Sequence, residues 1–173
     1  MGPNDRHFEI VHVYDLVTLE DDTFGDITFD TFHGSSIRKI GSNAFNKTAN
    51  KIKIFICWLC DLENQPPKYD LQNLFNQMTE LKLLVINLNI NKISTDFIKP
   101  ISGHQSKLTN LNIISTKKLT IKSNAFQNLN QLKYISFTFM TIDLIEKDAF
   151  KFINRNQNKL RITFGNCELT GKF

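Results

Sequence analysis

The sequence predicts a solenoid of stacked repeats, in which short parallel strands form one continuous sheet. An apolar-x-apolar unit occurs six times between Ile27 and Ile162, at a mean spacing of 27 residues. A second pattern, x-(Asn/Asp)-Ala-Phe, follows several of these units, and the chain is rich in Asn (19) and Phe (15). One such unit cannot bury its apolar face alone, so consecutive units must stack.

The first 24 residues do not follow this period. The segment from Phe8 to Tyr14 alternates like a strand or hairpin, and Glu20-Asp21-Asp22 indicates a turn after it. We therefore expect residues 1–24 to form an atypical N-terminal capping segment, and residues 25–173 to form the repeats.

Within each repeat, alternation places every second side chain in the core and the others on the outer surface. The Phe of the second pattern, as in Ser123-Asn124-Ala125-Phe126, is expected to fill the space between the strand layer and the opposite layer. The first apolar residues of the six predicted strands are Ile27, Phe55, Ile86, Leu111, Ile135 and Ile162.

The clearest unit, Leu83-x-x-Ile86-x-Leu88-x-x-Asn91-x-Ile93, resembles the leucine-rich repeat. The trailing Ala-Phe resembles the Phe-containing type found in extracellular and receptor proteins. The resemblance covers residues 24–173, although the position of Asn91 holds other residues in the other copies: Phe32, Cys60, Thr116, Met140 and Cys167.

This resemblance implies an α/β leucine-rich repeat solenoid of about six repeats. A curved parallel β-sheet would form its concave face, and loops and short helices its convex face. Such a solenoid commonly binds partners on the concave face.

The outward positions of the predicted strands are mostly small or polar, but Ile54, Ile56, Trp58 and Val85 would form an apolar patch. Exposed apolar patches mark interaction sites. The strand from Ile52 to Cys60 is apolar on both faces, so a slip of one residue would turn Ile54 and Ile56 inward. The predicted protein-binding residues are Ile54, Ile56, Trp58, Val85, Asn87, Asn112, Tyr134, Ser136 and Arg161.

The expected function is therefore non-enzymatic protein binding through the concave face, by a secreted protein or a receptor ectodomain fragment. The alternative is a non-catalytic subunit or inhibitor that binds a secreted enzyme. A weaker third hypothesis is a thiol enzyme that uses Cys57 and Cys60.

Cys57-Trp58-Leu59-Cys60 has a spacing that suits a redox pair, a disulfide or half of a zinc site. No second C-x-x-C exists to complete a zinc site, and these residues fall in a strand pattern rather than at a helix N-terminus. The repeat alignment places both side chains inward, which favours buried free thiols over a disulfide, a metal or catalysis.

Other chemical motifs are weak. None of His7, His12, His33 and His104 has a His or Cys partner for a metal at i+2 or i+4, and no phosphate-binding glycine loop is present. We expect no metal, no cofactor and no enzymatic activity. Asn46-Lys47-Thr48 is a glycosylation sequon, which would carry a glycan at Asn46 in a secreted protein.

Charge is unevenly distributed, because residues 1–32 hold eight acids and one base whereas the whole chain is +4. The bases are scattered and the aromatics fall at core spacing, which argues against a nucleic-acid partner. No apolar run reaches the roughly 18 residues of a membrane-spanning helix. The segment Met1–Asp5 lacks the apolar region of a signal peptide, so extracellular localisation is expected from the resemblance alone.

Overall fold

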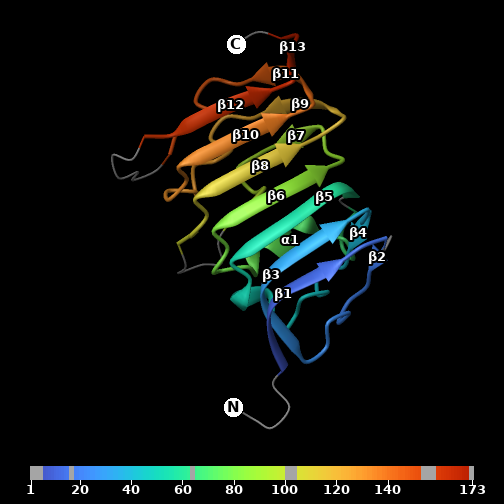
Figure 1. Cartoon of the computed structure of the whole chain (residues 1–173). Helices are drawn as coiled ribbons and strands as arrows, with labels where there is room; N and C mark the ends of the chain where they lie inside the picture. Colours follow the sequence, from blue (N-terminus) through green and yellow to red (C-terminus); the bar gives the residue numbers. More distant parts are fainter. Residues whose placement is uncertain (1–5, 16–17, 63–64, 100–104, 153–158, 172–173) are drawn as a thin grey trace.

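In the computed structural model the chain coils into a parallel β-solenoid of about six turns (Figure 1). The structure describes residues 6–15, 18–62, 65–99, 105–152 and 159–171. Strands account for 44% of these residues and helices for 6%. The repeat period in the sequence is therefore the period of the solenoid.

One face of the solenoid is a seven-stranded parallel sheet, and each of its strands belongs to a different turn. Neighbouring strands pair in a register that aligns equivalent positions of the repeats, such as Leu84 with Leu111 and Ile135 with Leu111. In sheet order the strands are β1 (Arg6–Val13), β3 (Ile27–Ser35), β5 (Ile54–Leu62), β6 (Leu83–Leu88), β8 (Asn110–Ile114), β10 (Tyr134–Thr138) and β12 (Arg161–Gly165).

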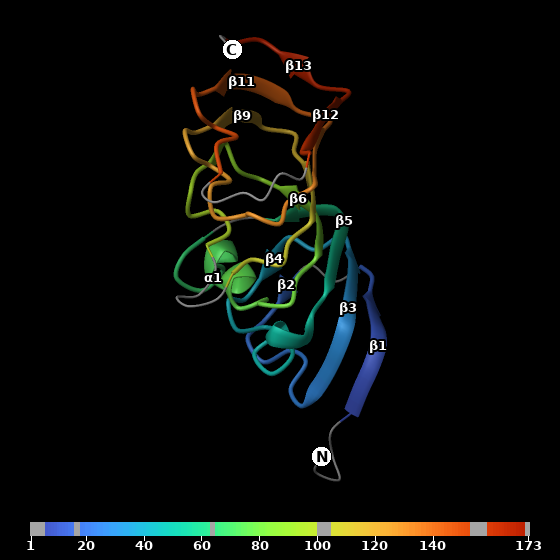
Figure 2. The same ribbon diagram turned by 90° about the vertical axis from the view of Figure 1, so that its left-hand side faces the viewer.

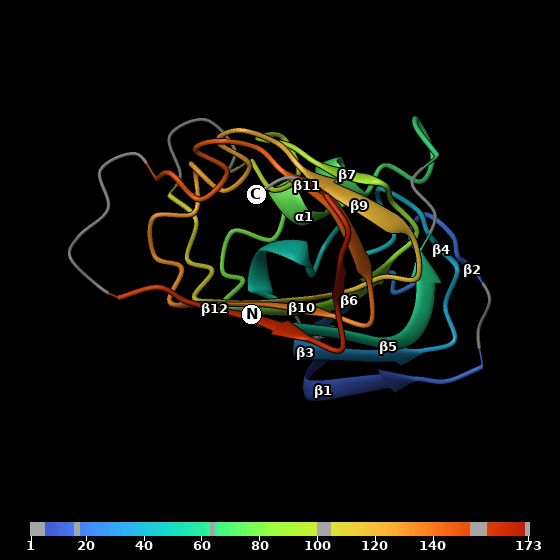
Figure 3. The same cartoon turned by 90° about the horizontal axis from the view of Figure 1, so that it is seen from above.

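The opposite face is also built mainly from short parallel strands (Figures 2 and 3). A two-stranded sheet lies at the N-terminal turns and a four-stranded sheet at the C-terminal turns, with helix α1 (Leu71–Asn76) on the same side. A 3-10 helix, η1 (Ala49–Lys51), precedes β5. The strands of the two sheets are β2 (Thr18–Leu19) and β4 (Lys39–Ile40), then β7 (Lys92–Ile93), β9 (Lys118–Ile121), β11 (Thr141–Ile145) and β13 (Glu168–Leu169).

The predicted α/β class, with short helices on the convex face, is therefore wrong. In β9 the side chains of Leu119 and Ile121 are fully buried while Lys118 and Thr120 are not, a two-residue alternation that suits a strand. In the x-(Asn/Asp)-Ala-Phe turns, Asn124 and Asp148 have φ of 57° and 63°. This left-handed conformation interrupts a right-handed helix, so these segments form turns.

The expected N-terminal strand is present, but it is not part of a hairpin. β1 pairs in parallel with β3, and β2 pairs in parallel with β4, so β1 and β2 add to the same two faces as the later turns. β1 is the edge strand, and its Phe8 and Ile10 remain 46% and 47% exposed.

The core lies between the two faces and contains two groups of Phe side chains whose rings pack against one another. Near the N-terminal turns, Phe32 lies 4.9 Å from Phe55 between ring centroids, and Phe45 lies 5.0 Å from Phe32. Near the C-terminal turns, Phe126 lies 5.5 Å from Phe150. Burying each of these rings stabilises the fold by about a few kcal/mol.

Candidate functional site

The residues of the seven-stranded sheet that point away from the core form its outer face, which is the face predicted to bind a partner. Parallel pairing aligns them in rows across the strands, about 4.8 Å apart. The central row contains His12, His33, Ile56, Val85, Asn112, Ser136 and Thr163, and the row beside it contains Ile54, Leu83, Asn110, Tyr134 and Arg161.

The register of β5 places Ile54 and Ile56 on the outer face. Phe55 and Cys57 are fully buried, whereas Ile54 and Ile56 are partly exposed and Trp58 is 44% exposed. The slip that would have turned the two isoleucines inward does not occur.

Ile54, Ile56, Trp58, Leu83 and Val85 together form what we call the apolar patch. Ile54 pairs with Leu83 and Ile56 with Val85, so β5 and β6 carry four of its members side by side. Val85 is only 7% exposed, so neighbouring side chains cover it. Trp58 is the most exposed member of the patch.

A disulfide between Cys57 and Cys60 lies beneath Trp58, which corrects the prediction of free thiols. Cys57 points inward by the regular alternation of β5, and the register shift between Cys57 and Leu62, where β5 pairs with β6, lies where Cys60 also turns inward. Their Cα atoms lie 5.5 Å apart, within the range of a disulfide. The repeat alignment treated the strand as regular and did not show that the two side chains meet. Cys167 is a free cysteine.

The disulfide closes a short loop that presents two large apolar side chains. Trp58 and Leu59 are 44% and 78% exposed, and Leu59 has a φ of 52°. Non-glycine residues rarely adopt this conformation. The disulfide between the flanking cysteines limits the backbone conformations that the loop can adopt. Trp58 and Leu59 therefore project from a constrained backbone.

Polar side chains occupy the outer face on the C-terminal side of the apolar patch. The hydroxyls of Tyr134 and Thr163 lie 3.0 Å apart, and Thr138 donates to Asn112 at 3.4 Å. The hydrogen bonds with Thr163 and Ser136 lower the pKa of Tyr134 below its ordinary value of 10.0. These groups already bond to one another, which orients them.

The remaining predicted residues lie on the same face at its edges. Asn87 pairs with Ile114, and its Oδ1 is buried with no hydrogen-bond partner in the part of the chain that the structure describes. Arg161 is exposed on β12. The register therefore brings all nine predicted protein-binding residues onto the outer face.

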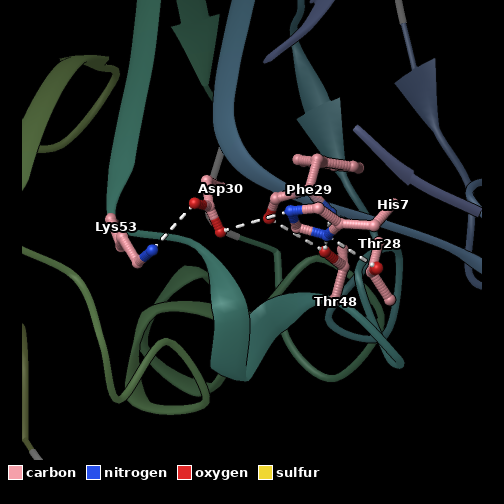
Figure 4. A network of polar contacts seen from close by, with 6 residues as sticks. All are labelled: His7, Thr28, Phe29, Asp30, Thr48 and Lys53. Carbon is pink, nitrogen blue, oxygen red and sulfur yellow. Dashed lines mark hydrogen bonds and ion pairs between the residues drawn. The ribbon is translucent and has the colours of Figure 1, made fainter. Parts of the chain in front are cut away.

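Asp30 and Lys53 connect the N-terminal turns (Figure 4). Lys53 donates to Asp30 at 2.8 Å, and His7 Nε2 lies 3.8 Å from the same carboxylate. The hydrogen bond from Lys53 is the main reason that the pKa of Asp30 falls below 3.8. His7 also bonds to Thr28 at 3.1 Å. This network ties β1, β3 and the start of β5 together.

The sequon lies at the side of the solenoid. Asn46 is exposed, and its amide donates to Asp22 at 3.3 Å. Thr48 is 1% exposed, and its hydroxyl accepts a hydrogen bond from the backbone N–H of Phe29 at 2.8 Å. Thr48 therefore has a structural role that does not depend on glycosylation.

Two histidines that sequence analysis treated separately come together on the outer face. His12 and His33 are register partners on β1 and β3, with ring centroids 5.1 Å apart. Tyr14 Oη lies 3.0 Å from His12 Nδ1. A spacing of i+2 or i+4 does not relate the two histidines, because 21 residues separate them in the sequence. Only the pairing register of β1 with β3, in which His12 lies opposite His33, brings the two side chains together.

No family model and no curated protein matches the chain. The solenoid architecture therefore rests on the strands and their register, and the finer resemblance to leucine-rich repeats has no family match to support it. None of the helices in the described residues is long and apolar enough to cross a membrane.

Proposed function

We propose that the protein is a non-enzymatic recognition module that binds another protein through the outer face of its seven-stranded sheet. The observation that carries the proposal is the apolar patch, which stands on a rigid parallel sheet beside the exposed Trp58–Leu59 loop. Exposed apolar patches mark interaction sites, and an aromatic side chain such as Trp58 is a typical energetic anchor of an interface.

The expected partner surface has an apolar centre and a polar border. Its apolar side chains would pack against Trp58, Ile54 and Ile56. Its border would exchange hydrogen bonds with the polar side of the outer face, around Asn112, Tyr134 and Ser136. Because the sheet backbone is held by neighbouring turns, little conformational entropy is lost on binding.

We further propose that the protein is extracellular, and that its repeat unit is the Phe-containing type of leucine-rich repeat. The Cys57–Cys60 disulfide supports the location, since disulfides persist in oxidising compartments. The exposure of Asn46 is compatible with a glycan there. The apolar-x-apolar units and the Ala-Phe turns support the repeat type. Inhibition of a secreted enzyme, or a non-catalytic role beside it, would use the same outer face.

The test is affinity capture from the native source, followed by a direct binding measurement with the purified partner. Wild type is compared with Trp58→Ala and Ile56→Asp, after circular dichroism has shown that each variant is folded. The control is Leu169→Asp, because Leu169 is 49% exposed on β13, on the opposite face of the solenoid.

A partner that binds wild type and Leu169→Asp, but not the two outer-face variants, would support the proposal. Its identity would separate a receptor-type partner from a secreted enzyme. Equal binding by all four proteins would refute the outer face as the site.

A further inference from the structure

We propose that His12 and His33 form a binding site for a divalent transition-metal ion, of the class of Cu²⁺, Ni²⁺ or Zn²⁺. The two imidazoles lie at registered positions on β1 and β3, on the outer face, where they are reachable from solvent. Neutral imidazole is the commonest protein ligand of these ions.

The separation of the two rings suits a shared ion. A ligating imidazole nitrogen lies about 2.0–2.1 Å from Zn²⁺, which places the ring centroid about 3.2 Å from the metal. Two such rings at a tetrahedral angle have centroids about 5.2 Å apart. The centroids of His12 and His33 lie 5.1 Å apart, and the ring planes are inclined at 52°. Such an inclination allows one nitrogen of each ring to point at a common centre.

Tyr14 completes the arrangement by orienting one ring. Its Oη lies 3.0 Å from His12 Nδ1, and its ring stacks on His12 with centroids 5.8 Å apart. When Nδ1–H donates to the phenol oxygen, the lone pair remains on Nε2, free for a metal. Such outer contacts fix the tautomer and the direction of ligating histidines.

The immediate neighbours of the pair on the outer face are uncharged and leave room for a cation. Residues 1–32 hold eight acids and one base, but Asp26, Asp30 and Glu20 form ion pairs with Lys47, Lys53 and Lys68. The outer-face positions beside the two histidines hold Ile10, Thr31, Ser35 and Ile56, and none of these described neighbours carries positive charge. A cation approaching the pair therefore meets no like charge at these adjoining positions.

The site has two protein ligands, and water would fill the other positions. Among the described residues, no group of three or more His, Cys, Asp or Glu side chains is placed to hold a metal ion. We therefore expect reversible binding, with Cu²⁺ bound more tightly than Ni²⁺ or Zn²⁺. Mg²⁺ and Ca²⁺, which prefer oxygen ligands, should not compete.

The experiment is isothermal titration calorimetry of the untagged protein with Cu²⁺ and with Zn²⁺. Saturable binding of one ion per chain is expected for wild type, and its loss in the same concentration range for both His12→Gln and His33→Gln. His7→Gln is the matched control, because His7 lies on the same strand but bonds to Thr28 and approaches Asp30. Tyr14→Phe should weaken binding about tenfold, as expected for a contact that orients a ligand.

Nuclear magnetic resonance of the histidine side chains locates the ion independently of affinity. Substoichiometric Cu²⁺ should broaden the signals of His12 and His33 before that of His7. The absence of saturable binding by wild type would overturn the proposal. So would undiminished binding by His12→Gln and His33→Gln in folded protein, or competition by Ca²⁺.

Discussion

The hydroxyl of Thr48 accepts a hydrogen bond from the backbone N–H of Phe29 at 2.8 Å, in the core side of the N-terminal turns (Figure 4). Both residues are essentially inaccessible to solvent. A buried backbone N–H without a partner is costly, so this contact connects a loop residue to the packing of β3.

Replacement of Thr48 by Ala should leave the N–H of Phe29 without a partner, and should lower the free energy of unfolding by about 1–3 kcal/mol. Urea denaturation of bacterially produced protein, which carries no N-glycan, measures this. Thr48→Ser retains the hydroxyl and should recover most of the loss. If Ser and Ala variants were equally destabilised, the lost methyl packing rather than the hydrogen bond would be responsible.

Removal of the Cys57–Cys60 disulfide should destabilise the fold by about 2 kcal/mol, the value expected for closing a loop of four residues. The double variant Cys57→Ala/Cys60→Ala is compared with wild type by denaturation with and without a thiol reductant. The reductant should destabilise wild type but leave the double variant unchanged. Cys167→Ala, which alters the free cysteine, should respond to the reductant as wild type does.

Two Phe residues in one turn offer a direct comparison of burial. Phe137 is fully buried and stacks on Phe164 with ring centroids 5.4 Å apart, whereas Phe139 is 60% exposed. Phe137→Ala should lower the free energy of unfolding by about 3–5 kcal/mol. Phe139→Ala should change it by less than about 0.5 kcal/mol. Thermal or urea unfolding measures both variants. Similar losses of stability in Phe137→Ala and Phe139→Ala would contradict the register that buries Phe137 and exposes Phe139.

Glu146 should make stability depend on pH in the acid range. It accepts hydrogen bonds from Lys122 Nζ at 2.6 Å and from the backbone N–H of Ser123 at 2.9 Å, and these, led by Lys122, hold its pKa below the ordinary 4.5. A carboxylate whose pKa is depressed in the folded state stabilises the fold above its unfolded-state pKa, and this contribution disappears as pH falls through the folded-state value.

Wild type should therefore exceed Glu146→Gln in stability near neutral pH, and the difference should shrink once the pH falls below about 4.5 and vanish below the folded-state pKa. Denaturation of both proteins between neutral pH and strongly acidic pH measures this difference. A difference that stays constant over the whole range would show that the carboxylate charge is not responsible.

Much of the seven-stranded sheet could be predicted from the chain itself. Alternation in segments such as Leu132–Phe137 identified the inward residues, because each unit must bury the same face to stack on the next one. The same alternation identified the outward set, including Ile54, Ile56 and Tyr134. These are local properties of the repeats, and stacking preserves them.

The opposite face could not be predicted in the same way. The segment around Leu119 and Ile121 is short, and its alternation alone did not distinguish a strand from the helix that the resemblance implied. Pairing with the neighbouring turns decides this, since β9 gains hydrogen bonds from both β7 and β11. A helix of similar length would leave several of its backbone groups without partners.

What the sequence determined by itself was the period, the strands of one face and the side chains that each strand buries, because these follow from alternation within one unit. Only the tertiary structure decided the β character of the second face, the disulfide between Cys57 and Cys60, and the meeting of His12 with His33. Each of these depends on the stagger between turns or on an irregularity within a strand. The stagger and the irregularity arise when whole units pack against one another, and the sequence of a single unit does not determine that packing.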